Sequence, residues 1–126
     1  MKTAQEKTYE ELYYSLWELA QRYSGFTQFR VIGKSHDERM IPMLEIGHGD
    51  SCIFCVGGFS GTDGKMSDML TLAAAEYCKT YECRWMIQDL YEVQKLLDRT
   101  RICMIPVVNP DGYEICRKGY NTVRNP

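Results

Sequence analysis

The chain has 126 residues, of which 44% are hydrophobic and 25% are charged, and it carries a formal net charge of −2. This length predicts one domain over residues 1–126, and the composition is typical of a globular protein with a hydrophobic core. The weak charge excludes the basic surface of nucleic-acid and anionic-membrane binders, and no apolar run is long enough for a signal peptide or a membrane span. We therefore expect a cytoplasmic location.

Hydrophobic periodicity predicts one helix followed by three strands. Thr8 and Glu11 match a capping box, and apolar residues follow them at spacings of three and four. Residues 29–32 and 40–46 are typical of two strands joined by a polar turn. A third strand over 52–56 is apolar on both faces, which favours a central place in the sheet.

A glycine-rich loop and further elements follow the third strand. Apolar stripes predict helices over 66–77 and 85–97, and residues 101–108 form a second strand that is apolar on both faces. Asn-Pro-Asp-Gly at 109–112 predicts a turn, and residues 113–126 have no clear period. Strands separated by helices imply a right-handed crossover, so we expect an α/β fold with a mixed, mostly parallel sheet.

The six cysteines are expected to be free thiols, because nothing in the sequence indicates an oxidising compartment. Cys52 and Cys55 match the CxxC pattern of zinc and redox sites. On a strand, however, side chains three positions apart point to opposite faces, so both sulfurs cannot bind one metal, and we predict that this pair lies in the core. The full set is Cys52, Cys55, Cys78, Cys83, Cys103 and Cys116.

Several motifs occur in an order and at spacings that resemble the zinc carboxypeptidases, the M14 metallopeptidase family. They are "TYEEL", "RVIGKSHDERMIPMLEIG", "CIFCVGGFSG" and "MIPVVNPDGYE". The resemblance covers nearly the whole chain and about the first third to half of a full catalytic domain. It implies an αβα sandwich and a zinc-dependent hydrolase of peptide C-termini. The ending "NPDGYEICRKGYNTVRNP" resembles bacterial members that trim cell-wall peptides.

In that family the first two zinc ligands are a histidine and a glutamate in the loop after the central strand. The matching positions here hold Ser60 and Asp63. A neutral hydroxyl lacks the basicity of imidazole and the charge of a carboxylate. The family's third ligand is a downstream histidine, and this chain has no histidine after His48. Its general-base glutamate and substrate-covering tyrosine also lie further downstream. We therefore expect no zinc or other cofactor, and no catalysis, in this chain.

Five polar residues each have a structural and a functional interpretation. Arg124 lies near the offset at which the family places a substrate-contacting arginine, although an exposed surface arginine is the favoured interpretation. His36 and His48 are expected to be solvated turn residues, and Asp111 a turn former. Asp63 is expected to cap the following helix rather than to bind metal.

Three functions remain open. The chain is an inactive carboxypeptidase-family protein, a non-enzymatic module that binds a peptide or a partner chain, or a hydrolase with a different catalytic constellation. The last is disfavoured because no Ser-His-Asp or Cys-His arrangement is evident. The resemblance also implies an open edge on the strand over 52–56. We expect that edge to be covered by homodimerisation or by residues 113–126.

Overall fold

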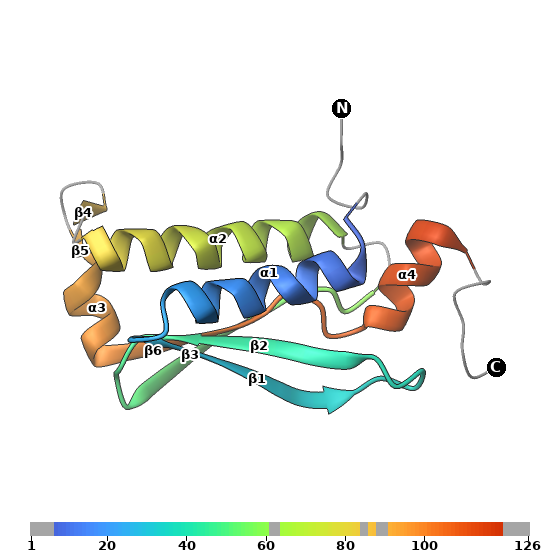
Figure 1. The fold of residues 1–126 in the computed structure, drawn as a ribbon, viewed down its shortest axis with the longest axis horizontal. Coiled ribbons are helices and arrows are strands. Elements are labelled where there is room, and N and C mark those ends of the chain that lie inside the picture. The colour runs from blue at the N-terminus through green and yellow to red at the C-terminus, as the bar shows by residue number, and fades with distance from the viewer. Residues whose placement is uncertain (1–6, 61–63, 84–85, 88–90, 120–126) are drawn as a thin grey trace.

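The computed structural model describes residues 7–60, 64–83, 86–87 and 91–119, which form a sheet with a layer of helices on one of its faces (Figure 1). Within these residues, no helix combines the length and the apolar character needed to cross a membrane. The elements are α1 (Tyr9–Arg22), β1 (Thr27–Lys34), β2 (Met40–Ile46), β3 (Ser51–Val56), α2 (Gly64–Cys83), β4 (Met86–Ile87), β5 (Tyr91–Glu92), α3 (Val93–Arg99), β6 (Thr100–Ile105) and α4 (Pro110–Lys118).

The main sheet has the strand order β1-β2-β6-β3. β1 pairs with β2 and β2 with β6 in antiparallel fashion, whereas β3 pairs with β6 in parallel. The chain leaves β3 and returns to its neighbour β6 after α2 and α3, as a parallel pair requires. The predicted α/β class and mixed sheet are confirmed. The sheet is not mostly parallel, however, because β3 and β6 are the only parallel pair among the strands that the structure describes.

The helical layer packs on the sheet through apolar side chains placed by helical periodicity. The predicted capping box is present, since the Thr8 hydroxyl accepts from the Glu11 N–H at 2.9 Å and the Glu11 carboxylate accepts from the Thr8 N–H at 2.8 Å. α1 and α2 lie side by side over the sheet (Figure 1). The core between them and the strands includes Leu16, Ala20, Leu44, Ile46, Ala74, Cys78, Val93, Leu97, Ile102 and Met104.

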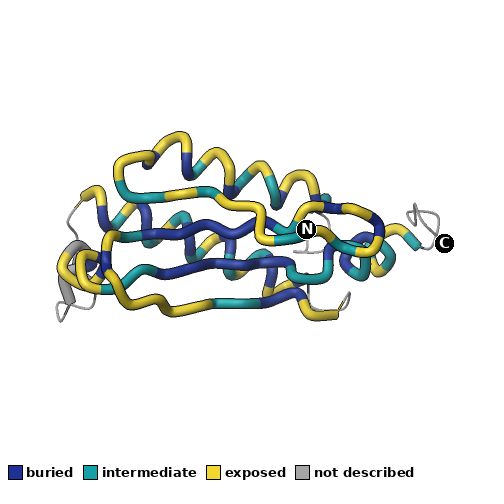
Figure 2. Tube along the Cα trace, turned by 90° about the horizontal axis from the view of Figure 1, so that it is seen from below, coloured by how far each residue is buried: buried dark blue, intermediate teal, exposed yellow. Residues whose placement is uncertain are grey.

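The prediction that the strand over 52–56 is central is wrong, because β3 is an edge strand. The Ile53 and Phe54 side chains are 52% and 61% exposed. Figure 2 shows the contrast between the buried inner strands and the exposed outer ones. An apolar run indicates that a strand is suited to burial on both faces, but not that both of its neighbours are present. Among the described strands, β3 therefore has an open edge, as the family resemblance implies. The expected covering of this edge by residues 113–126 stays a prediction, because residues 120–126 lie outside the described part of the chain.

Two further predictions need correction. Among the described residues of the helix predicted over 85–97, only those in α3 are helical, because Met86–Ile87 and Tyr91–Glu92 pair as the short antiparallel strands β4 and β5. Residues 85 and 88–90 lie outside the described part of the chain. Isoleucine and tyrosine favour strands, and this preference prevails over the helical stripe. The turn predicted at 109–112 is the start of α4. Asn109 caps that helix and Pro110 occupies its first turn, where the missing proline N–H costs nothing.

Candidate functional site

The candidate site lies at the end of the sheet where β3 and β6 finish. The β3 loop, residues 57–60, follows β3, and α4 follows β6 after a short connection. The turn between β1 and β2, residues 35–39, reaches the same end, so it lies beside α4 (Figure 1). Loops at the carboxyl ends of parallel strands are the usual place for ligands in α/β proteins.

The β3 loop is held by backbone hydrogen bonds to the segment that leaves β6. The Gly57 N–H donates to the Ile105 carbonyl at 3.0 Å, and the Gly57 carbonyl accepts from the Val108 N–H at 3.0 Å. The Asn109 N–H donates to the Gly58 carbonyl at 2.9 Å. These bonds extend the β3–β6 ladder beyond the strands and fix where the loop begins.

The two glycines of the loop are required by close packing. Gly58 has a φ of +71°, and a Cβ on it would lie 2.7 Å from the Val107 Cα. A Cβ on Gly57 would lie 2.7 Å from Leu70 and 2.8 Å from Met66, both on α2. Only glycine combines that φ with such an approach. The loop is thus pressed between α2 and the end of β6.

Asn109 joins the β3 loop to α4. Its side-chain oxygen accepts from the Gly112 N–H at 3.0 Å and caps the helix. Its side-chain nitrogen donates to the Phe59 carbonyl at 3.2 Å. One amide therefore satisfies a free helix N–H and positions the tip of the loop, which needs both a donor and an acceptor on a short side chain.

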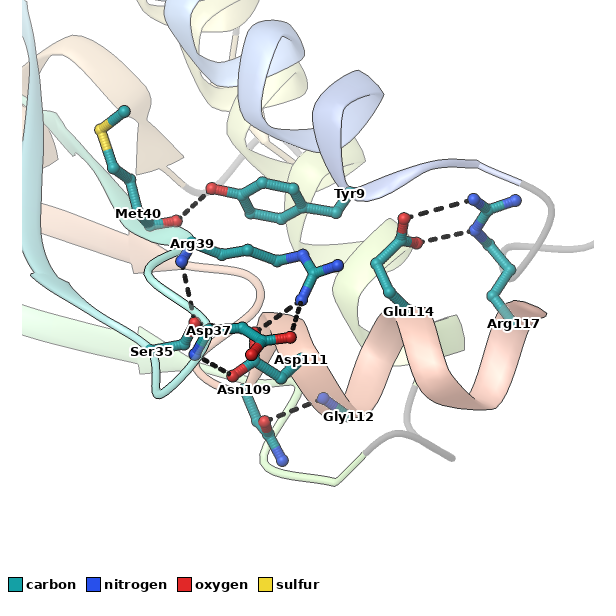
Figure 3. A network of polar contacts seen from close by, with 10 residues as sticks. All are labelled: Tyr9, Ser35, Asp37, Arg39, Met40, Asn109, Asp111, Gly112, Glu114 and Arg117. Carbon is teal, nitrogen blue, oxygen red and sulfur yellow. Dashed lines mark hydrogen bonds and ion pairs between the residues drawn. The ribbon is translucent and has the colours of Figure 1, made fainter. Parts of the chain in front are cut away.

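A buried polar network joins the β1–β2 turn to α4 (Figure 3). Asp111 accepts from the Ser35 hydroxyl at 2.7 Å, from the Asp37 N–H at 3.0 Å and from the Arg39 guanidinium at 2.9 Å. Arg39 also pairs with the Asp37 carboxylate at 3.2 Å, and both of these side chains are 95% buried or more. Asp111 is thus the link between two segments more than seventy residues apart in the chain.

The electrostatics of this network favour the charged forms. Burial alone would raise the pKa of Asp111, but hydrogen bonds from the Asp37 N–H, the Ser35 hydroxyl and Arg39 lower it below its usual value. Burial would likewise lower the pKa of Arg39, whereas its bond to Asp111 and the nearby carboxylates raise it. The shifts in opposite directions are those of an ion pair that stabilises both partners. The network therefore has a structural role, because it joins the β1–β2 turn to α4.

Of the zinc-ligand positions predicted from the family resemblance, the structure describes only Ser60. It lies at the end of the β3 loop and is exposed. Asp63 and Arg124 lie outside the described residues, so their predicted roles stay predictions. His36 and His48 are exposed, as expected of turn residues. They lie beyond opposite ends of β2, about 20 Å or more apart at a rise of about 3.3 Å per residue, which rules out a shared metal.

The described side chains at this end of the sheet do not fit a catalytic zinc. Among the described residues, no three His, Cys, Asp or Glu side chains are grouped closely enough to hold a metal ion. The donor that the β3 loop offers at the family's histidine position is the Ser60 hydroxyl, which is a weak zinc ligand. The backbone of the loop thus resembles that of a zinc-ligand loop, but its Ser60 hydroxyl is a poor zinc ligand.

Sequence reasoning missed the roles of Arg39 and Asp111. Asp111 was expected to bond within its own turn, but Asn109 makes that local bond and Asp111 pairs across the molecule. Two features of the sequence could have indicated this ion pair. Arg39 lies at the end of a polar turn next to a strand, and Asp111 lies in the first turn of a helix. Neither residue indicates its partner without the fold.

The cysteine prediction is partly wrong. Cys55 packs against the main core cluster and Cys52 is exposed, so the pair does point to opposite faces, but Cys52 is not in the core. All six cysteines are free thiols in the structure. Among the described strands, β3 pairs only with β6, so Cys52 lies on an edge strand of the sheet.

Comparison with known proteins agrees with this fold. The family model described as zinc carboxypeptidase matches residues 12–125. Carboxypeptidase D of Anas platyrhynchos is 32% identical over 120 residues, covering 89% of this chain and 8% of that protein. Carboxypeptidase Z of Homo sapiens is 27% identical over 124 residues, covering 90% of this chain and 18% of that protein. This chain therefore spans a small part of each relative.

Solved structures of other proteins share this fold. Bovine thrombin-activatable fibrinolysis inhibitor, solved in complex with tick carboxypeptidase inhibitor, superposes with a TM-score of 0.74 at 18% identity, over 94% of this chain and 35% of that one. The carboxypeptidase A from Helicoverpa armigera superposes with a TM-score of 0.57 at 25% identity, over 90% of this chain and 27% of that one. Of the expected αβα sandwich, the described residues supply the sheet and one helical layer. The chain belongs to the zinc carboxypeptidase family.

Proposed function

We propose that this chain keeps the scaffold of a carboxypeptidase zinc loop without its catalytic chemistry. The observation that carries the proposal is Ser60, which stands at the family's histidine position in a loop otherwise fixed by glycines, backbone bonds and Asn109. A catalytic zinc needs three good ligands and an open position for water. The chain holds two histidines, and both lie before the β3 loop in the sequence.

A peptidase assay on the 126-residue chain tests this proposal. We expect no zinc-dependent release of C-terminal residues from peptides or cell-wall peptides. We expect the same of the variant Ser60→His/Asp63→Glu, because these 126 residues still offer no histidine after the β3 loop to complete a set of three zinc ligands. An active member of the family is the positive control, and circular dichroism checks the fold of the variant. Chelator-sensitive turnover by either protein would refute the proposal.

The exposed edge of β3 favours a second function, in which the chain is a non-enzymatic module that binds a partner chain. Ile53 and Phe54 are more than half exposed on an apolar strand, and among the described strands one side of β3 has no neighbour in the sheet. Free backbone N–H and C=O groups on an edge strand form a template for pairing with another strand. We propose that the partner is a second copy of the chain, because two identical edges can pair by twofold symmetry.

Light scattering during size-exclusion chromatography tests the self-association. We expect a dimer for the unmodified chain and a monomer for Phe54→Lys, since a charge on an edge strand opposes pairing. Ile32→Lys on the opposite edge strand β1 is the matched control, because Ile32 is also an exposed apolar residue, and this variant should remain dimeric. A monomeric unmodified chain, or a dimer that Phe54→Lys leaves intact, would exclude the β3 edge as the interface.

A further inference from the structure

Three aromatic side chains form a row along α1, namely Tyr13, Tyr14 and Trp17. The ring centroids of Tyr13 and Tyr14 are 5.2 Å apart, those of Tyr14 and Trp17 are 6.4 Å apart, and both pairs meet nearly edge to face. Tyr13 also packs against Phe29 of β1. Tyr14 and Trp17 are instead 55% and 43% exposed. The aromatic row is thus anchored on the sheet through Tyr13 and exposes large ring surfaces at Tyr14 and Trp17.

Two shallow grooves meet at Tyr14. One has a volume of about 180 Å³ and lies between α1 and the β1–β2 turn, and the other, of about 330 Å³, runs along α1. Tyr14 and Glu10 line both grooves and so form the ridge between them. The first groove is preformed, because the Tyr9 hydroxyl donates to the Met40 carbonyl and ties α1 to the start of β2 (Figure 3).

The charged side chains that line the two grooves are acidic, with one exception. The acidic residues are Glu10, Glu11, Glu18 and Glu38. Glu10, Glu18 and Glu38 are exposed and form no ion pair with any residue that the structure describes. The exception is Arg39, which is buried and already paired with Asp111. The grooves therefore present unpaired negative charge beside exposed aromatic rings.

We propose that this surface binds a basic peptide through two of its arginine side chains. A guanidinium stacks on the faces of tyrosine and tryptophan rings and pairs bidentately with carboxylates, so one arginine uses both features of a groove. Two guanidinium groups that stack on opposite faces of one ring are about 7–8 Å apart. Residues i and i+2 of an extended peptide are about 6.6 Å apart. The sequence Arg-x-Arg therefore places one arginine in each groove, on either side of Tyr14.

This surface is separate from both sites of the proposed functions. Tyr13 anchors the aromatic row on β1, and the strand order places β1 and β3 at opposite edges of the described sheet. Peptide binding at Tyr14 therefore needs no zinc in the β3 loop and leaves the β3 edge free to pair. The result of its test is independent of the outcomes for those two functions.

Isothermal titration calorimetry of the 126-residue chain with the blocked peptide Ac-Gly-Arg-Gly-Arg-Gly-NH2 at low ionic strength tests this proposal. The matched control is Ac-Gly-Gln-Gly-Gln-Gly-NH2, which has the same length and no charge. We expect the arginine peptide to bind at least about tenfold more tightly than the glutamine peptide, and its affinity to fall as salt is added. Equal affinities for the two peptides, or no binding of the arginine peptide, would overturn the proposal.

Removal of the central ring locates the binding surface. Tyr14→Ala should weaken binding of the arginine peptide at least about fivefold, because each guanidinium loses the ring on which it stacks. Phe59→Ala is the matched control, since Phe59 is 65% exposed but lies in the β3 loop, and it should leave the affinity unchanged. If Tyr14→Ala binds as tightly as the unmodified chain, or if both variants lose affinity equally, the aromatic row is not the site.

Substitution of one carboxylate from each groove separates local pairing from attraction to the net charge. Glu18→Gln/Glu38→Gln should weaken binding of the arginine peptide about fivefold. Glu76→Gln/Glu82→Gln removes the same charge from two exposed positions of α2 and should have little effect. Equal losses in the two double variants would show that the peptide responds only to net charge, and the proposal would fail. Thermal unfolding checks that each variant is folded.

Discussion

Replacing Arg39 by methionine is expected to lower the free energy of unfolding by about 3–5 kcal/mol. The substitution removes the cation between Asp37 and Asp111 while nearly preserving side-chain volume. Asp37 is 2% exposed, so its carboxylate would stay buried without its cation. An uncompensated buried charge costs several times more than a lost surface ion pair. Denaturant unfolding monitored by circular dichroism measures the effect.

Arg30→Met is the matched control for this substitution. It removes an arginine of the same size from an ion pair with Glu45, but the Arg30 side chain is 48% exposed and Glu45 keeps Arg101. We expect a loss of about 1 kcal/mol or less. Similar losses in Arg30→Met and Arg39→Met would mean that the network between the β1–β2 turn and α4 contributes no more than a surface pair.

Gly49→Ala is expected to destabilise the chain by about 3 kcal/mol or more, because overpacking against backbone has little room to relax. A Cβ on Gly49 would lie 1.9 Å from the carbonyl carbon of Arg99 and 2.1 Å from the Thr100 nitrogen. These backbone atoms belong to the junction of α3 and β6, so the turn before β3 would have to move away. The pairing of β3 with β6 begins at Ser51 and Thr100, directly beside this contact.

Gly25→Ala provides the comparison for Gly49→Ala. Nothing lies within 4 Å of a Cβ at Gly25, so the extra methyl group meets no steric obstacle. We expect a change of less than about 1 kcal/mol, in the stabilising direction if the restriction of the unfolded chain dominates. Thermal unfolding of both variants decides the point. Equal midpoints for Gly49→Ala and the unmodified chain would show that the turn adapts without cost.

The secondary structure with strong local signals could be predicted from the sequence. Thr8 and Glu11 identified the start of α1 because both halves of a capping box lie within four residues. Residues that are typical of two different structures were harder to interpret. Asn109 and Pro110 favour a turn and a helix start equally well, and only the presence of α4 decides between them.

The place of β3 in the sheet could not be predicted from its own residues. An apolar strand with Ile53 and Phe54 has the composition of a buried strand, yet both side chains are largely exposed. Composition reflects the environment to which a strand is suited, whereas exposure depends on which neighbours are present. The family resemblance provided the missing information, because it implied an open edge.

The position of the candidate site could be predicted from the sequence, but the contacts that support it could not. The glycine pattern located the β3 loop, and the structure explains Gly58 by its φ of +71° and its approach to Val107. The pairing of Arg39 with Asp111 spans 72 positions in the chain. Cys52 and Arg101 meet only through the register of β3 and β6. Such contacts follow from strand pairing, which local sequence patterns do not specify.

We propose that the glycine-fixed β3 loop binds no catalytic zinc. Equilibrium dialysis of the reduced 126-residue chain against zinc, with metal analysis by mass spectrometry, tests it most directly. We predict equal zinc content, far below one ion per chain, for the unmodified chain and for Ser60→Ala/Asp63→Ala. One tightly bound zinc ion per chain that this double substitution removes would contradict the claim.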